Sequence, residues 1–389
     1  MPRTILVTGG AGFIGSHVVD RLLARGDRVR VLDDLDPQVH GEGAGPDRLP
    51  EYLDPATDFV HGSVCDRAAV ERACDGVDAV IHLAAAVGVG QSMYRVEHYT
   101  RTNTVGTAVL LETLAERPVA RLVVASSMSI YGEGLYTRAD GGRVDDATRR
   151  RDALEAGAWE PLDGHGRPLD AVPTPEDKHP ALASVYALSK YDQERLCLVM
   201  GEAYGIPTVA LRFFNAYGPR QALGNPYTGV LAIFAARYLN GNPPLIFEDG
   251  HQRRDFVSVH DVARACLLAL DSGRAAGEAI NIGSGQPRSV REVAVAMGRV
   301  MGREHIQPEI TGEYRVGDIR HCYADIRRAR DLLGYAPRVA FEDGLDELAT
   351  WLAGQTADDR VGVMKAELAA RGLTLAARRH VPERAARGG

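Results

Sequence analysis

Three side chains in the first half of the chain have the types and the spacing needed to move a proton. Tyr186 and Lys190, in the stretch YALSK, are four residues apart and would share one face of a helix. A free phenol has a pKa of about 10, too high for a base at neutral pH, but a nearby ammonium stabilises the phenolate. Ser127, in SSMSIYG at 126–132, could hydrogen-bond the same reacting oxygen. Together these side chains predict acid–base chemistry at a hydroxyl group.

A Tyr–x–x–x–Lys pair alone is weak, because any surface helix can carry one by chance. A glycine-rich turn, TGGAGFIGS at 8–16, supplies context, since it follows the apolar run Thr4–Thr8 and precedes a helical stretch at 16–24. Such a turn lets backbone N–H groups approach a pyrophosphate at the helix N-terminus. The alternative is a turn that packs and binds nothing. The expected dinucleotide contacts are Gly9, Gly12, Phe13, Ile14 and Gly15.

The end of the next apolar run indicates which dinucleotide binds. Asp33 and Asp34 follow the run Arg28–Leu32. A carboxylate there accepts hydrogen bonds from an adenosine ribose and repels a 2′-phosphate, which predicts NAD rather than NADP. The positive ring of oxidised NAD and the Lys190 ammonium could together lower the pKa of Tyr186 by roughly three units, or about 4 kcal/mol. The phenolate could then take a hydroxyl proton while hydride leaves to the cofactor.

Apolar runs alternate with helical stretches along the first two thirds of the chain. The strand-like runs are 4–8, 28–32, 58–60, 79–83, 121–126 and 207–212. Helical stretches such as 103–116 and 186–204 separate them. This alternation predicts an α/β fold with a doubly wound parallel sheet. Ligands bind at the carboxyl ends of such strands, so small residues there should contact the cofactor: Ser63, Val64, Leu83, Ala84 and Ala85.

Changes in composition divide the chain. The dinucleotide-binding domain should span 1–214, with further elements near 255–283, where Val262–Leu270 and Ala279–Ile282 return to the sheet. A smaller domain covering the substrate should occupy most of 215–355. The polar insertion 133–182 could cover the site or project from the surface, and the sequence leaves both open. The Ala- and Arg-rich tail 356–389 contains a helical patch at 362–371 and a basic end, and it is expected to be partly disordered.

Composition argues against several classes of partner. The 389 residues carry 45 Lys and Arg against 52 Asp and Glu, a net charge of −7, so we expect no nucleic acid partner. No apolar run is long enough to span a membrane. The five cysteines lack C-x-x-C spacing, which argues against a metal site or a disulfide framework and suits a reducing cytoplasm: Cys65, Cys74, Cys197, Cys266 and Cys322.

These motifs resemble the extended short-chain dehydrogenase/reductase family, in its nucleotide-sugar epimerase/dehydratase branch. The resemblance covers roughly 1–350 and leaves out most of 133–182. It implies a Rossmann domain with tightly held NAD, a smaller domain that grips a dTDP- or UDP-hexose, and a homodimer packed through the helices near 103–116 and 186–204. Lys190 would also bind the nicotinamide ribose. One departure is Ser63, which stands where the family often has Asp, so the Val64 backbone becomes the expected adenine contact.

The resemblance also implies further contacts, position by position. Asn103, in TNTVGT, matches an asparagine near the active site and is expected to contact the cofactor, whereas the following residues are expected to contact the substrate. Val87 belongs to the stretch AVGVGQSMY, which resembles 4-epimerases of dTDP-6-deoxyhexoses. The remaining implied contacts lie in RFFNAYGPR, RRDFVSVHDV and YRVGDIRHCYAD: Asn215, Arg220, Arg254, Arg315, Asp318 and Cys322. For the arginines the alternative is a surface salt bridge. For Cys322, expected to leave room for the rotating sugar, it is a buried cysteine without substrate contact.

The two residues that follow Ser127, Met128 and Ser129, discriminate between the reactions of the family. Dehydratases of the family carry Asp and Glu where this chain has Met128 and Ser129, and its decarboxylases keep the Glu. We therefore expect neither dehydration nor decarboxylation. A 4-epimerase remains, which oxidises C4, rotates the 4-keto sugar and returns hydride, with a dTDP-6-deoxyhexose favoured over a UDP-hexose and Ser129 as a sugar contact. The alternatives are a 4-ketoreductase, an epimerase or decarboxylase of UDP-glucuronate, and a catalytically silent module that senses NAD.

Overall fold

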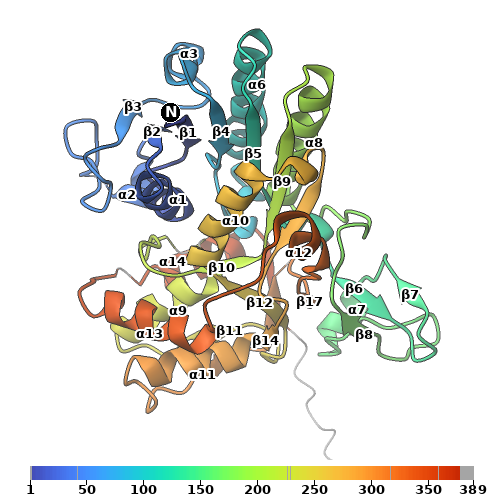
Figure 1. Cartoon of the computed structure of the whole chain (residues 1–389). Coiled ribbons are helices and arrows are strands. Elements are labelled where there is room, and N and C mark those ends of the chain that lie inside the picture. Colours follow the sequence, from blue (N-terminus) through green and yellow to red (C-terminus); the bar gives the residue numbers. More distant parts are fainter. Residues whose placement is uncertain are drawn as a thin grey trace, which may run out of the picture.

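The computed structural model describes residues 2–41, 43–225, 227, 229–315, 317–357 and 359–376. Its centre is a seven-stranded sheet in which every neighbouring pair is parallel (Figure 1). In spatial order the strands are β3 (Asp58–His61), β2 (Arg28–Asp33), β1 (Thr4–Thr8), β4 (Ala79–His82), β5 (Arg121–Ser127), β9 (Thr208–Phe213) and β13 (Ala279–Ile282). The chain therefore reverses direction across the sheet between β1 and β4, where such folds bind dinucleotides. The predicted doubly wound sheet is confirmed.

Helices cover both faces of this sheet (Figure 1). Alternate β1 residues point to opposite faces: Ile5 and Val7 pack in one buried cluster and Leu6 in the other. The first cluster includes α1 (Phe13–Ala24), α10 (Val259–Asp271) and α12 (Arg327–Leu333). The second includes α3 (Arg67–Cys74), α6 (Gly106–Glu116) and α8 (Val185–Ala203).

Two boundaries differ from those predicted. Val262–Leu270 was expected in the sheet, but these residues lie in helix α10, which packs on the sheet, and only Ala279–Ile282 forms a strand. The apolar residues of this stretch recur at helical spacing, which the strand assignment overlooked. The helix predicted over 103–116 begins earlier, as the π-helical turn η1 (Thr100–Val105) that runs directly into α6.

A smaller mixed sheet lies below the carboxyl ends of the large one (Figure 1). Its strands are β10 (Asn215–Tyr217), β12 (Arg253–Ser258), β14 (Pro287–Ser289) and β17 (His321–Cys322). The helices α9 (Val230–Leu239), α11 (Val290–Val300) and α13 (Phe341–Leu352) form a third buried cluster beside it. β11 (Leu245–Ile246) pairs with β15 (Glu309–Ile310).

The insertion 133–182 forms a small unit of its own. β6 (Leu135–Thr137) pairs antiparallel with β7 (Arg143–Val144) and with β8 (Asp170–Val172), and α7 (Arg151–Glu155) lies between β7 and β8 in the chain. The unit projects to one side of the molecule (Figure 1). The remaining short elements are α2 (Pro37–His40), α4 (Val89–Ser92), α5 (Val96–Tyr99), η2 (Met128–Tyr131) and η3 (Gly273–Ala275).

The described part of the tail contains one helix and one strand. α14 (Val361–Ala370) buries Val361, Met364 and Leu368, which recur at helical spacing, and it matches the helical patch expected at 362–371. β18 (Thr374–Ala376), which was not expected, pairs antiparallel with β16 (Glu313–Arg315). The rest of the tail, 377–389, lies outside the described residues.

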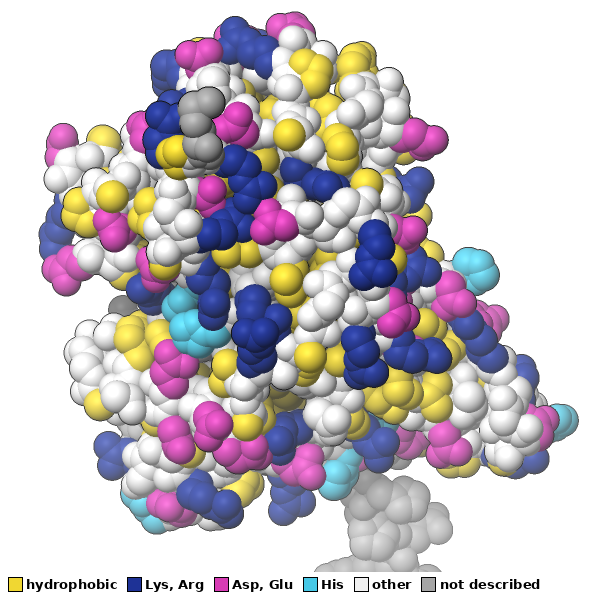
Figure 2. Space-filling view, viewed as in Figure 1, with side chains coloured by type: hydrophobic (Ala, Val, Ile, Leu, Met, Phe, Trp, Pro, Cys, Tyr) yellow, Lys and Arg dark blue, Asp and Glu magenta, His cyan; other side chains and the backbone are white. Residues whose placement is uncertain are grey.

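The surface and the helices agree with the composition. Acidic and basic side chains lie intermixed over the face seen in Figure 2. Among the described residues, no helix combines the length and the apolar character that crossing a membrane requires.

Candidate active site

A cavity of about 480 Å³ runs along the carboxyl ends of β1, β2, β4 and β5, at the point where the strand order reverses. Most of the predicted site residues line it: Gly9, Gly12, Phe13, Ile14, Gly15, Asp33, Asp34, Val64, Leu83, Ala84, Ala85, Val87, Ser127, Ser129, Tyr186, Lys190 and Asn215. No residue of the insertion 133–182 belongs to its lining.

The glycine turn suits a pyrophosphate. Gly9 has a φ of +69°, which favours glycine, and a Cβ on Gly15 would collide with the Gly9 carbonyl oxygen. A Cβ on Gly12 would instead come no closer than 3.3 Å to that oxygen. Gly12 is the N-cap of α1, and no side chain caps the helix there. The N-terminal N–H groups of α1 therefore face the cavity without a side-chain acceptor, which fits the diphosphate of a dinucleotide.

The two aspartates after β2 have different environments. The Asp33 carboxylate accepts hydrogen bonds from the backbone N–H groups of Ala11 and Leu35, both at 3.0 Å. Burial raises the pKa of Asp33. Asp33 therefore holds the glycine turn in place, whereas the more exposed Asp34 lines the same cavity beside it. Their position next to the turn fits an adenosine ribose.

Ser127, Tyr186 and Lys190 lie at the other end of this cavity. Ser127 ends β5, where its Oγ accepts a hydrogen bond from the Ser129 backbone at 3.2 Å and its hydroxyl also hydrogen-bonds the Tyr186 side chain. Tyr186 stands in the first turn of α8, which Ser184 caps. Burial raises the pKa of Tyr186 and the Ser127 hydrogen bond opposes that shift. Burial lowers the pKa of Lys190 to about 8.

Asn103 supports the cavity wall from behind. Its Oδ1 accepts from the Ala86 N–H at 2.7 Å, and its Nδ2 donates to the Ala86 carbonyl and to the Ser189 Oγ. It lies in the π-helical turn η1 and is fully buried. Ser63, the other predicted cofactor contact outside the lining, accepts from the Cys65 N–H through its own Oγ. Both residues hold backbone in place.

Three polar atoms of the lining have no partner among the described residues. Ser129 Oγ, Asn215 Oδ1 and Gln221 Oε1 are buried and form no hydrogen bond there. Buried polar atoms are normally hydrogen-bonded, so these atoms suit a ligand that brings its own hydroxyl or amide groups. Met128 and Phe214 add apolar surface to the same lining.

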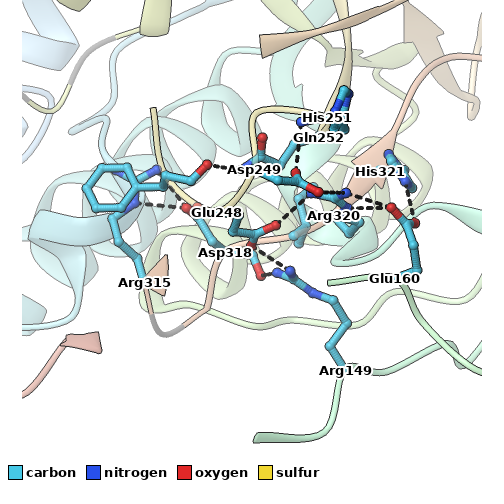
Figure 3. A network of polar contacts seen from close by, with 12 residues as sticks. Arg149, Glu160, Glu248, Asp249, His251, Gln252, Arg315, Asp318, Arg320 and His321 are labelled. Carbon is cyan, nitrogen blue, oxygen red and sulfur yellow. Dashed lines mark hydrogen bonds and ion pairs between the residues drawn. The ribbon is translucent and has the colours of Figure 1, made fainter. Parts of the chain in front are cut away.

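Five predicted substrate contacts lie outside the lining. Arg220 pairs with Asp20 at 2.7 Å, and Arg254 donates to the carbonyl groups of Ile319 and Arg320. Arg315 pairs with Asp318 at 2.8 Å, at the edge of a polar network (Figure 3). Cys322 is only 1% exposed and packs in an apolar cluster behind Met128 and Phe214. In this arrangement these side chains serve the protein's own structure.

Sequence reasoning missed four amide side chains that line the cavity, namely Gln221 and a hydrogen-bonded group of three. Gln38 Nε2 donates to Asn225 Oδ1 at 3.2 Å and to Gln91 Oε1 at 3.3 Å. These contacts join α2, after β2, to α4 and to the loop before α9. Single amides in short turns carry no motif, and the three residues come from separate parts of the chain, so no local signal could have identified them.

Comparisons with known proteins agree with this geometry. Residues 5–283 match the NAD dependent epimerase/dehydratase family. The chain is 36% identical over 356 residues to a dTDP-L-rhamnose 4-epimerase of Burkholderia thailandensis, covering 90% of this chain and 95% of that protein. It is 32% identical to a dTDP-glucose 4,6-dehydratase of an Actinoplanes species, over 89% of this chain and 97% of that one. The solved UDP-glucose 4-epimerase of Thermotoga maritima, with UDP-glucose, is 31% identical and superimposes with a TM-score of 0.72, over 90% of this chain and 98% of that one.

Proposed function

The chain belongs to the NAD-dependent epimerase/dehydratase family, and we propose that within this family it inverts C4 of a nucleoside-diphosphate hexose. NAD is its cofactor, and the uncapped α1 N-terminus, Gly12 and the aspartates after β2 would hold it. When bound, NAD would supply the reversible hydride acceptor for C4.

The distribution of carboxylates in the cavity carries this proposal. Among the described residues, the acidic side chains of the lining are Asp33, the last residue of β2, and Asp34 and Asp36, which follow it at the end assigned to the adenosine. The other end holds Ser127 and Tyr186, beside Met128 and Ser129. A methionine cannot transfer a proton and a serine hydroxyl is a poor substitute for a carboxylate. The site therefore has the groups for reversible oxidation of a hydroxyl and lacks the further acid that loss of water requires.

The chain's own residues would act on a single oxygen atom. The Tyr186 phenolate would accept the proton of the sugar 4-hydroxyl, while the Ser127 hydroxyl donates a hydrogen bond to the same oxygen. Because the keto sugar can rotate in the cavity, the Tyr186 phenol would return the proton after hydride reaches the opposite face. The Lys190 ammonium would stabilise the phenolate and bind the nicotinamide ribose.

For the substrate we favour a dTDP-6-deoxyhexose such as dTDP-L-rhamnose, with a UDP-hexose as the alternative. The 36% identity to a protein of that activity supports this choice. Ser129 and Asn215 would meet sugar or phosphate oxygens through their unpartnered polar atoms, and Val87 would line the sugar pocket. Contacts from Arg254 and Arg315 to the diphosphate, from Asp318 to the ribose and from Arg220 to the substrate remain predictions, and they require these side chains to leave their present partners.

A panel of nucleotide sugars tests the proposal. The purified protein is incubated with dTDP-L-rhamnose, UDP-glucose and UDP-glucuronate, and the products are identified by proton NMR. We expect inversion at C4 for one of the first two sugars, without added cofactor and without net change in its redox state. Stoichiometric consumption of a reduced nicotinamide, or release of water or carbon dioxide, would contradict the assignment.

A further inference from the structure

The Lys190 ammonium donates a hydrogen bond to an uncharged side chain. Its Nζ donates to Oε1 of Gln193 at 2.7 Å, one helical turn further along α8. Both side chains are buried, with 3% of Lys190 and 1% of Gln193 exposed. An ammonium group has donors only, so the oxygen of the Gln193 amide must face it.

The amide nitrogen of Gln193 contacts helix α6 and the segment after β4, and the residues behind it reach β1. Its Nε2 donates to Thr107 Oγ1 at 2.9 Å and lies 3.4 Å from the Ala84 carbonyl oxygen. The His82 ring bridges the threonines behind it, with Nε2 at 2.9 Å from Thr107 Oγ1 and Nδ1 at 2.7 Å from Thr8 Oγ1. These contacts join α8 and α6 to the carboxyl ends of β4 and β1, so the amide cannot rotate without breaking them.

The carboxylate next in sequence is engaged elsewhere. Glu194 accepts from the Arg212 guanidinium at 2.7 and 2.9 Å and from the Ser126 hydroxyl at 2.6 Å. Its negative charge is therefore paired with Arg212. Lys190 forms no ion pair among the described residues.

The other titratable groups around Lys190 are neutral near pH 7. Burial lowers the pKa of His82, on β4, to about 3 and raises that of Cys197, on α8, to about 12. Burial also raises the pKa of Tyr99, on α5, whose ring meets that of Tyr186 edge-on at 6.4 Å. Among the described residues, the carboxylate that acts on the Lys190 charge is therefore Glu194, which forms its ion pair with Arg212 and not with Lys190.

We propose that Gln193 is a positioning residue, which holds the Lys190 ammonium at the cavity without neutralising it, so that the full charge acts on the Tyr186 phenol. The inference rests on the proposed function, since Gln193 acts through Lys190 on the same reaction. A glutamate here would pair with Lys190 and cancel its field. A methionine of similar length would remove the acceptor and make the ammonium easier to deprotonate.

Two variants and one control test this in the NAD-loaded protein. The phenol is titrated by ultraviolet difference absorbance between each protein and its own Tyr186→Phe counterpart, which needs no substrate. We expect Gln193→Glu to raise the apparent pKa of the phenol by about one unit. We expect Gln193→Met to move the alkaline limb of the pH profile of kcat/KM to lower pH. The control Arg195→Gln changes the net charge by the same amount as Gln193→Glu, at an exposed position of α8. It should shift neither the phenol titration nor the alkaline limb of the kcat/KM profile.

The outcomes separate this inference from the proposed function. A phenol titration in Gln193→Glu that matches wild type, or an alkaline limb in Gln193→Met that stays in place, would overturn the role of Gln193 while wild type still epimerises sugar. If Gln193→Glu fails to fold, the Gln193→Met profile decides. Wild-type protein that inverts no sugar, or a Tyr186→Phe variant with full activity, would refute the proposed function instead.

Discussion

Burial acts in opposite directions on the two titratable side chains beside Ser127. It raises the pKa of Tyr186 and lowers that of Lys190 to about 8, because the charged form of either group loses hydration. The phenol is thus protonated at neutral pH without a ligand. A second positive charge nearby would favour the phenolate, and the oxidised nicotinamide ring carries one. The base should therefore form only when the cofactor is in place.

The first prediction concerns Tyr186. Tyr186→Phe removes the hydroxyl that transfers the proton but keeps the ring and its edge-on contact with Tyr99. We expect turnover to fall by roughly two to four orders of magnitude, the usual effect of a positioned acid or base. Bound NAD, measured by its absorbance after denaturation, should remain at the wild-type level. Turnover within about threefold of wild type would exclude Tyr186 as the base.

Lys190 should also leave a signature in the pH dependence of stability. Its folded pKa of about 8 lies below the ordinary value of 10.5, so the unfolded chain binds more protons between these values. The free energy of unfolding of cofactor-free wild type should therefore rise with pH across this window, relative to Lys190→Met, and the penalty should be complete below pH 8. Urea unfolding of both proteins at several pH values measures the difference. A difference independent of pH would show that the folded pKa of Lys190 is not lowered.

The turn between β1 and α1 shows how one element combines packing and binding. Gly15 lies so close to the Gly9 carbonyl that a side chain cannot fit, whereas a Cβ on Gly12 would make only a tight contact of 3.3 Å with the same oxygen. The N–H groups between them have no side-chain acceptor. The same short segment therefore contains one position that serves the fold and one that serves the ligand.

Matched alanine substitutions separate these two roles. Gly15→Ala should lower the melting temperature, because the new methyl group displaces the Gly9 carbonyl. Gly12→Ala should leave stability closer to wild type but weaken NAD binding, since the methyl group occupies space expected for the pyrophosphate. Calorimetry and NAD titration measure the two effects. Equal losses of stability, with unchanged NAD affinity for Gly12→Ala, would contradict the assignment.

Elements with a local pattern could be predicted from the sequence, and those held by distant partners could not. The strands, the glycine turn and the cavity beside Ser127, Tyr186 and Lys190 follow from apolar runs and from the rule that parallel strands end at one edge. The insertion is different, because Arg149 and Glu160 anchor it to Glu248 and Arg320 (Figure 3). These ion pairs join residues far apart in sequence. The same holds for Arg254, whose partners depend on how the chain near 320 folds back.

The helices near 103–116 and 186–204, which were expected to form a dimer interface, carry both buried and exposed apolar side chains. Leu110, Leu111, Leu114 and Leu198 pack inside the monomer and are not available to a partner. Val105, Leu188 and Val199 are 47%, 47% and 53% exposed and belong to η1 and α8. These exposed side chains remain for a partner subunit.

We predict a homodimer that a charge on this surface disrupts. Light scattering at micromolar concentration should give twice the chain mass for wild type and a monomer mass for Val199→Glu. Val363→Glu, an equally exposed valine on α14, is the control and should stay dimeric. A monomeric wild type would refute the interface.

In the proposed reaction, hydride leaves C4 and returns to the other face of the same sugar. A nucleotide sugar with deuterium at C4, chosen as the best substrate of the panel, follows this hydride. We expect mass spectrometry and NMR to find product inverted at C4 with deuterium still on C4, at a rate slower than for the unlabelled sugar. Inverted product that has exchanged its deuterium for solvent hydrogen would refute this reaction.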